Sequence, residues 1–124
     1  MKKNNYLNKL NLKNQIAIVI GGFGLIGYEI SKALSDAGAK VIILDKKINK
    51  KLINKFYFFN FDCKNYHNFQ NELIKIKKEV GLPKIYINAS YPASSDWATS
   101  TFEKINLNSF KENIDLHLNS YTYM

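Results

Sequence analysis

The fold is decided by the stretch Val19-Ile20-Gly21-Gly22-Phe23-Gly24-Leu25-Ile26-Gly27-Tyr28-Glu29-Ile30-Ser31-Lys32. It begins inside an apolar run, residues 15–20, which is the pattern of a strand buried on both faces. Glycines then interrupt the run, and apolar residues recur at helical spacing over 25–37 until Gly38 supplies a helix stop. The stretch therefore predicts a buried strand, a glycine-rich turn and a helix.

Outward from this stretch, the chain continues to alternate apolar runs with amphipathic segments. Further strands are predicted at 40–45, 56–62 and 84–88. Helices are predicted at 66–80 and from 107 onward, and the lysine-rich segment 46–55 could hold a brief helix. This alternation indicates an α/β fold in which the first four strands and flanking helices form a doubly wound parallel sheet of Rossmann type. We expect residues 1–14 to be a polar lead-in and 15–124 to form the domain.

The glycine turn has the spacing of a dinucleotide-binding loop. Gly22-x-Gly24-x-x-Gly27 alone is weak evidence, but it follows a buried strand, opens a helix and precedes Asp45 at the end of the next strand. Glycines let a pyrophosphate approach the backbone, and the helix N-terminus offers N–H groups and a positive dipole end. Asp45 could then accept both ribose hydroxyls and would repel a 2′-phosphate. The alternative is a tight turn that holds no ligand.

Composition narrows the classes of partner. The net charge is +8, yet all eighteen basic residues are scattered lysines, without the arginines that favour phosphate and base-edge contacts. We therefore expect a solvated basic surface, with no nucleic-acid partner. The single cysteine, Cys63, excludes a disulfide framework and a thiolate metal site, and we expect no metal. The apolar run at 16–20 is too short to span a bilayer, so we expect no membrane partner and a cytoplasmic protein.

Over residues 12–124 the sequence resembles the short-chain dehydrogenase/reductase family. The segment 20–27 is similar to the family's glycine-rich loop, with Ile20 in place of the usual Thr. The spacing Gly21-x-x-Gly24-x-x-Gly27 also fits the form found in the family's extended branch. Two later motifs add to the likeness: Asp62-Cys63 is similar to the acid that ends the third strand, and Ile87-Asn88-Ala89-Ser90 resembles the Asn-Asn-Ala-Gly signature with its first and last residues replaced.

The resemblance implies a set of cofactor contacts. The pyrophosphate would lie against Gly21, Gly22, Gly24 and Gly27, helped by the backbone of Leu25 and Ile26. Asp45 would hold the adenosine ribose, Asp62 and Cys63 the adenine, and Asn88 and Ala89 the inner ribose. These contacts favour NAD over NADP because of the Asp45 carboxylate, although Lys46 and Lys47 could soften that discrimination.

One further segment bears on catalysis. Ile114-Asp115-Leu116-His117-Leu118 is similar to the family's Asp-Val-Asn-Leu pattern, and the catalytic Asn of that pattern falls on His117. A histidine there could hold a water or accept a proton, so His117 is a candidate catalytic residue with an altered relay. The alternative is a helix histidine that fills a polar gap.

A second proton-transfer signal lies in the opening stretch. Family members carry a catalytic Tyr and Lys four residues apart, and Tyr28-x-x-x-Lys32 has this spacing. The pair lies on the helix that would receive the pyrophosphate, whereas the nicotinamide must extend away from that helix. We therefore interpret the pair as a surface arrangement and not as the catalytic one.

The family pattern continues beyond this chain, which lacks the expected Ser and Tyr-x-x-x-Lys. We expect an N-terminal, NAD-binding portion of an oxidoreductase with its C-terminal half absent, inactive alone, with a fourth strand left as an unpaired, aggregation-prone edge. The complete enzyme would bind a dinucleotide and a small-molecule substrate and form a homo-oligomer. The loop at 89–97 also resembles oxidoreductases of surface-glycan and nonulosonic-acid pathways, which suggests a sugar derivative. The alternative function is a non-catalytic dinucleotide-binding module.

Overall fold

The computed structural model describes residues 10–124 except residues 54, 100 and 102. Most of the predicted lead-in, 1–9, thus lies outside the described residues. The described elements are β1 (Ile16–Ile20), α2 (Leu25–Asp36), β2 (Lys40–Asp45), β3 (Tyr57–Asn60), the 3-10 helix η1 (Cys63–Asn68), α3 (Phe69–Glu79), β4 (Ile85–Asn88) and α4 (Leu107–Tyr123). None of the helices among these residues is both long and apolar enough to cross a bilayer.

The four strands form one parallel sheet in the order β3-β2-β1-β4. This confirms the predicted α/β class with its parallel sheet. The chain builds outward from β1 through β2 to β3, and then returns to pair β4 with the other side of β1. The order therefore reverses between β1 and β4, which in open α/β sheets is where ligands bind beyond the carboxyl ends of the strands.

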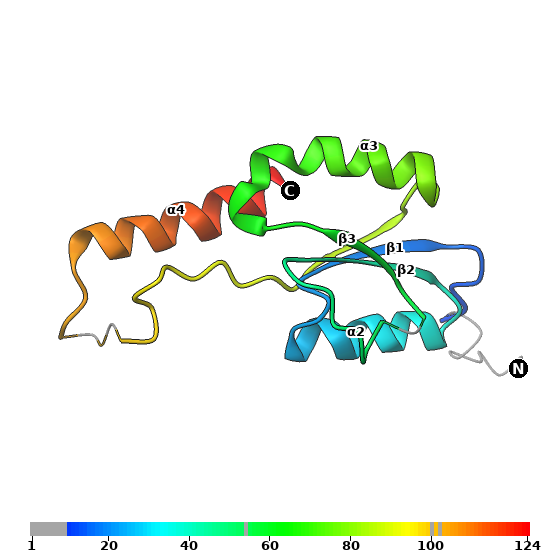
Figure 1. Cartoon of the computed structure of the whole chain (residues 1–124), viewed down its shortest axis with the longest axis horizontal. Helices are drawn as coiled ribbons and strands as arrows, with labels where there is room; N and C mark the ends of the chain where they lie inside the picture. Colours follow the sequence, from blue (N-terminus) through cyan, green and yellow to red (C-terminus); the bar gives the residue numbers. More distant parts are fainter. Residues whose placement is uncertain (1–9, 54, 100, 102) are drawn as a thin grey trace, which may run out of the picture.

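Helices cover both faces of the sheet, with α2 on one side and α3 on the other (Figure 1). Because side chains alternate across a strand, β1 and β2 supply apolar residues to both sides. Toward α2 the buried core contains Ala17, Val19, Val41 and Ile43. Toward α3 it contains Ile18, Ile20, Ile42, Leu44, Phe61, Phe69 and Ile76. The apolar runs of β1 and β2 are thus explained by burial on both faces.

The segment 89–106 and helix α4 extend beyond the carboxyl ends of the strands (Figure 1). The segment is tied to α4 by the side chain of Asn113, which accepts from Ser94 N–H at 3.1 Å and donates to Ser94 Oγ at 2.6 Å. At its far end α4 returns to η1, where the rings of Tyr123 and Tyr66 lie 5.7 Å apart. This part of the chain therefore contacts the rest of the domain both directly after β4, where the Ala89 N–H donates to Ile20 O, and at the C-terminal end of α4.

Two predictions about local structure were wrong in detail. The described residues of 46–55 form turns and no helix, closed by single bonds such as Leu52 N–H to Asn49 O. Five of the ten residues at 46–55 are lysines, and the pairs Lys46/Lys50 and Lys47/Lys51 would place like charges four residues apart, which destabilises a helix. The helix predicted at 66–80 instead follows a 3-10 turn that begins at Cys63, because the Asp62 side chain accepts the Lys64 N–H and caps the start.

Candidate functional site

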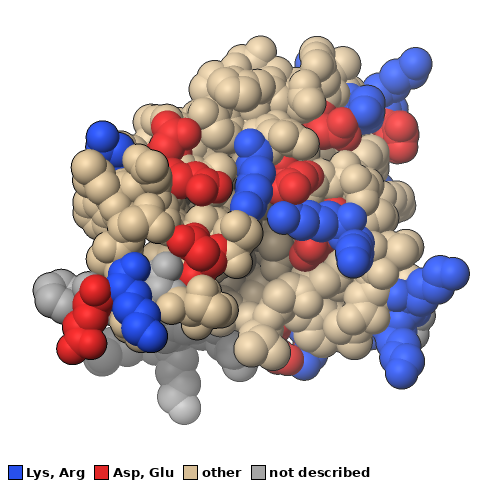
Figure 2. Space-filling model, turned by 60° about the vertical axis from the view of Figure 1, so that its left-hand side comes forward, with Lys and Arg blue, Asp and Glu red and all other residues tan. Residues whose placement is uncertain are grey.

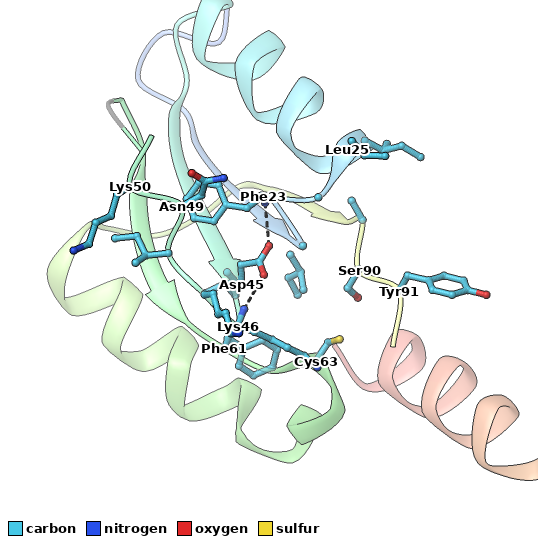
Figure 3. Close-up of a pocket in the computed structure, with 18 of the residues that line it drawn as sticks. Phe23, Leu25, Asp45, Lys46, Asn49, Lys50, Phe61, Cys63, Ser90 and Tyr91 are labelled. Atoms are coloured by element: carbon cyan, nitrogen blue, oxygen red, sulfur yellow. Dashed lines mark hydrogen bonds between the residues drawn. The ribbon is translucent and has the colours of Figure 1, made fainter. Parts of the chain in front are cut away.

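A cavity of about 870 Å³ lies at the carboxyl ends of the strands. It is bounded by the turn after β1, the segment after β2, the residues after β3 and the residues after β4 (Figure 3). Its lining residues are Ile20, Gly21, Phe23, Gly24, Leu25, Ile26, Leu44 to Lys51, Phe61, Cys63, Ala89, Ser90 and Tyr91. The cavity therefore spans the reversal point between β1 and β4.

The glycines permit close packing around this turn. Gly21 has a φ of +71°, and a Cβ on it would lie 2.9 Å from the Ala89 carbonyl oxygen. A Cβ on Gly27 would lie only 2.1 Å from the Gly21 carbonyl oxygen, and one on Gly22 would lie 2.8 Å from the Ile43 side chain. Gly21 and Gly27 are thus the glycines that the compact turn requires, and Gly22 packs against the core.

The first turn of α2 faces solvent beside the cavity. Gly24 is its N-cap and offers no side chain, while Leu25 is 94% exposed and Ile26 is 73% exposed. The first N–H groups of any helix lack acceptors within the helix. Together with the helix dipole, they make this turn suited to an anion, and a Cβ at Gly24 would meet only one atom, at 3.2 Å.

Asp45 joins the end of β2 to the glycine turn. Its Oδ2 accepts the Phe23 N–H at 3.0 Å and its Oδ1 accepts the Lys46 N–H at 2.8 Å (Figure 3). Each carboxylate oxygen has a further lone pair, so Asp45 can still accept hydroxyl groups from a ligand. The acid is thereby held at the cavity wall by two backbone contacts.

The acid at the end of β3 has a partner that sequence reasoning did not identify. Asp62 Oδ2 lies 3.3 Å from Lys46 Nζ, so Lys46 reaches across from the end of β2. Next to it, Cys63 lines the cavity, and burial raises the pKa of its thiol although a hydrogen bond with Ser90 opposes this. Among the described residues no group of His, Cys, Asp and Glu could hold a metal ion.

After β4 the chain passes directly over the glycine turn. The Asn88 Oδ1 accepts from the Ser90 N–H at 3.1 Å and the Ser90 Oγ at 2.6 Å, while the Ala89 N–H donates to Ile20 O. Ala89 and Ser90 line the cavity, whereas Asn88 does not. Within the described part of the chain, the buried Asn88 Nδ2 has no hydrogen-bond partner. An amide donor without an acceptor is costly, so this atom could serve a bound group.

His117 lies on α4 among aromatic rings. Its ring centroid is 4.7 Å from that of Tyr91 and 5.5 Å from that of Tyr121. The buried Nε2 of His117 also has no partner among the residues described. Tyr91 lines the cavity and His117 does not, so the Tyr91 ring lies between His117 and the cavity.

The Tyr28 and Lys32 pair lies outside the cavity. Lys32 Nζ is 2.8 Å from the Glu29 carboxylate and 5.4 Å from the centroid of the Tyr28 ring, while Tyr28 packs edge-on against Phe56. Neither residue lines the cavity. The arrangement agrees with the interpretation of the pair as a surface contact.

Sequence reasoning missed two contributions to the cavity. Lys46 and Lys47 were expected beside Asp45, but Lys50 and Lys51 of the same segment also line the cavity and were not identified. Tyr91 also lines the cavity, and its place one residue after the motif at 87–90 could have indicated this. On the face drawn in Figure 2, lysines alternate with acidic residues and form no uniformly basic patch.

Known proteins resemble this chain in sequence and in fold. Residues 15–124 match the family model described as short chain dehydrogenase. A search of curated protein sequences found no match. Among solved structures, gox2181 is similar with 26% identity, a TM-score of 0.80, and coverage of 95% of this chain and 48% of that one.

Two further structures show the same partial coverage. The ligand-free aldohexose dehydrogenase of Thermoplasma acidophilum has 26% identity and a TM-score of 0.72, covering 90% of this chain and 42% of that one. A short chain dehydrogenase of Leptospira borgpetersenii, solved with bound NAD+, has 22% identity and a TM-score of 0.73, covering 99% and 47%. The chain thus spans about half the length of the solved structures that it matches.

Proposed function

The chain belongs to the short-chain dehydrogenase family, and on this basis we propose that it forms the NAD(H)-binding part of an oxidoreductase. The bound cofactor would supply hydride transfer between nicotinamide and a carbonyl or hydroxyl carbon of a small molecule. The observation that carries the proposal is the glycine turn, where a Cβ on Gly21 or Gly27 would clash with backbone and where Asp45 is bonded to the same turn.

The proposed cofactor contacts are those that the family resemblance implies. Seven of these residues line the cavity: Gly21, Gly24, Leu25, Ile26, Asp45, Cys63 and Ala89. The backbone at Gly21, Gly22, Gly24 and Gly27, with the N–H groups of Leu25 and Ile26, would hold the pyrophosphate. Asp45 would accept the adenosine ribose hydroxyls, Asp62 and Cys63 would flank the adenine, and Asn88 and Ala89 would contact the inner ribose. His117 is proposed at the position of the catalytic asparagine of the family. We assign the dinucleotide-binding domain to 15–124.

Charge supports NAD as the cofactor. The Asp45 carboxylate would repel a 2′-phosphate, and Lys46, which could attract one, is paired with Asp62. The similar protein of Leptospira borgpetersenii has NAD+ bound. NADP is therefore proposed as the weaker ligand.

For the substrate we propose a sugar derivative. The similar solved structures include an aldohexose dehydrogenase and a 2-keto-3-deoxy-D-gluconate dehydrogenase. A narrower assignment to surface-glycan or nonulosonic-acid pathways rests only on the sequence of the loop at 89–97. A homo-oligomer in the cytoplasm completes the proposal.

The test is a fluorescence titration of the chain with NADH, NADPH and a duplex oligonucleotide. We expect saturable binding of NADH, weaker binding of NADPH, and no binding of the duplex. In Asp45→Asn the preference for NADH should fall by about tenfold or more, because a charge-assisted hydrogen bond contributes about 1.5–3 kcal/mol. Asp36→Asn, which makes the same charge change outside the cavity wall, should bind as the unmodified chain does.

The outcomes separate the candidate functions. Failure of NADH to bind would overturn the proposal. NADH binding without turnover by this chain is expected of both functions, because both use the same glycine turn and the chain lacks the expected Ser and Tyr-x-x-x-Lys. Coding DNA that continues in frame past codon 124 with Ser and Tyr-x-x-x-Lys would favour the oxidoreductase, and a stable native product that stops there and binds NADH would favour the non-catalytic dinucleotide-binding module.

A further inference from the structure

The order of the strand ends indicates which side chains face the reacting end of a bound dinucleotide. Asp45 ends β2, Gly21 follows β1, and Ala89 follows β4, and these strands are neighbours in the sheet. A dinucleotide held at Asp45 and crossing the glycine turn therefore reaches the residues after β4. Tyr91 lies at that end of the cavity (Figure 3).

Tyr91 belongs to a row of rings that runs from the loop to α4. Its centroid lies 5.8 Å from that of Trp97 and 4.7 Å from that of His117, and His117 lies 5.5 Å from Tyr121. Tyr91 is 58% exposed, and Trp97 and Tyr121 are each 45% exposed. We call Trp97, Tyr91, His117 and Tyr121 the aromatic row. Neighbouring rings in the row are inclined by 66°, 67° and 89°, so they meet edge to face and a ligand packs on the exposed face of one ring at a time. Tyr91 is the member of the row that lines the cavity.

The loop that carries Tyr91 and Trp97 is held by polar contacts, of which the two between Ser94 and Asn113 are buried. Asp96 Oδ1 accepts from Ser94 Oγ at 2.6 Å and from Ser109 Oγ at 2.8 Å. Asn113 bonds Ser94 from α4, and the Tyr121 hydroxyl donates to Ser90 O at 2.7 Å. The rings of Tyr91 and Trp97 are thereby pre-organised, which lowers the entropy cost of binding a ligand against them.

The chemistry of the row combines ring faces with hydrogen-bonding groups. The Tyr91 hydroxyl and the Trp97 N–H stand at ring edges, the Tyr121 hydroxyl can still accept a hydrogen bond while it donates to Ser90 O, and the His117 Nε2 is buried without a partner among the described residues. A cyclic carbohydrate matches this set, because the C–H face of its ring packs on an aromatic face while its hydroxyls bond at the rim.

We propose that Tyr91 and Trp97 form a stacking platform for a carbohydrate ring and determine specificity for cyclic over acyclic polyols. This rests on the proposed function, since the placement of the platform follows from the dinucleotide.

Trp97 is the single tryptophan of the chain, so its fluorescence reports on the platform. The chain is first saturated with NAD+, and its emission is then titrated with D-glucose, D-galactose and N-acetyl-D-glucosamine, and separately with the acyclic polyol sorbitol. We expect at least one cyclic sugar to change the emission saturably and sorbitol to do so at least tenfold more weakly. Tyr91→Ala should weaken the response to the sugar about fivefold, on the scale of a lost aromatic contact.

Tyr57→Ala is the matched control, because Tyr57 has the same 45% exposure as Trp97 but lies at the amino end of β3. It should leave the titration unchanged. Equal, linear responses to all the sugars and sorbitol while NAD+ binds would overturn the platform and leave the proposed function standing. Equal effects of Tyr91→Ala and Tyr57→Ala would also overturn it. Failure of NAD+ itself to bind would overturn the proposed function and the platform with it.

Discussion

Gly27 and Gly24 occupy the same turn but meet different surroundings. A Cβ at Gly27 would lie 2.1 Å from the Gly21 carbonyl oxygen and 3.0 Å from the Gly22 Cα, both of which are backbone atoms. At Gly24 a Cβ would meet only the Gly21 carbonyl oxygen, at 3.2 Å. Gly27 is therefore needed for packing of α2 against β1, whereas Gly24 leaves space at the N-terminus of the helix.

Alanine substitutions should separate these two roles. Gly27→Ala should lower the free energy of unfolding by about 1–3 kcal/mol, the usual cost of overpacking. Gly24→Ala should lower it by less than about 1 kcal/mol, yet weaken NADH binding, because a methyl group would stand where the pyrophosphate is proposed. Urea unfolding and NADH titration of both variants make the measurement. Unchanged NADH affinity in Gly24→Ala would contradict the proposed position of the pyrophosphate.

At the scale of elements, α4 and the segment before it depend on side-chain hydrogen bonds. Asn106 caps α4 by accepting the Ser109 N–H, and Asn113 makes three bonds, two to Ser94 and one to Ser109 O. Asn113 is 6% exposed. Because a buried polar group that loses its partner is costly, Asn113 is the main link between the loop and the helix.

Removal of that link should loosen the loop. Asn113→Ala is expected to lower the free energy of unfolding by about 1–3 kcal/mol, since the Ser94 N–H and hydroxyl lose their partner. Asn119→Ala, on the same helix, removes only a bond between the exposed Asn119 and Asp115 and should cost less than about 0.5 kcal/mol. Urea unfolding monitored by Trp97 fluorescence compares the two. Equal costs would show that the buried network does not hold the loop.

For the whole molecule, the two edges of the sheet are not equivalent. β4 pairs only with β1 in the described sheet, which agrees with the predicted unpaired edge, and β3 at the other edge pairs only with β2. The difference lies in the apolar surface beside each edge. Beside β4 lies an apolar cavity of about 360 Å³ lined by residues such as Phe69, Leu73 and Tyr86. Burial raises the pKa of Tyr86 to about 12, as expected for a phenol held against apolar groups. At the other edge, the Lys40 ammonium lies over the Tyr57 ring.

This asymmetry predicts association through β4. We expect the chain at micromolar concentration to scatter light and to elute as a mixture of species. Tyr86→Lys should reduce the scattering, because a lysine on an edge strand opposes pairing, whereas Tyr57→Lys on β3 should have little effect. Light scattering during size-exclusion chromatography tests this. A monodisperse preparation of the unmodified chain that melts cooperatively would contradict the prediction.

The sequence by itself determined the order of the elements and the position of the glycine turn. Both are local properties, because apolar runs predict buried strands and helical spacing predicts α2 and α3. In the turn, the φ of +71° at Gly21 favours glycine, and a Cβ on Gly27 would lie 2.1 Å from a backbone oxygen. Asp45 was also predictable at the cavity, because a residue that ends a strand beside β1 must lie near the turn after β1.

The tertiary structure alone decided which distant side chains meet. The Lys46–Asp62 ion pair, the bond of Ser94 to Asn113, and the contact of Tyr91 with His117 each join residues far apart in the sequence. No periodicity encodes such contacts. The ion pair depends on the pairing of β2 with β3, and the other two contacts depend on the path of the chain after β4 and on where α4 packs. A pattern of residues indicates what each element is, but the packing of the elements decides which groups line the site.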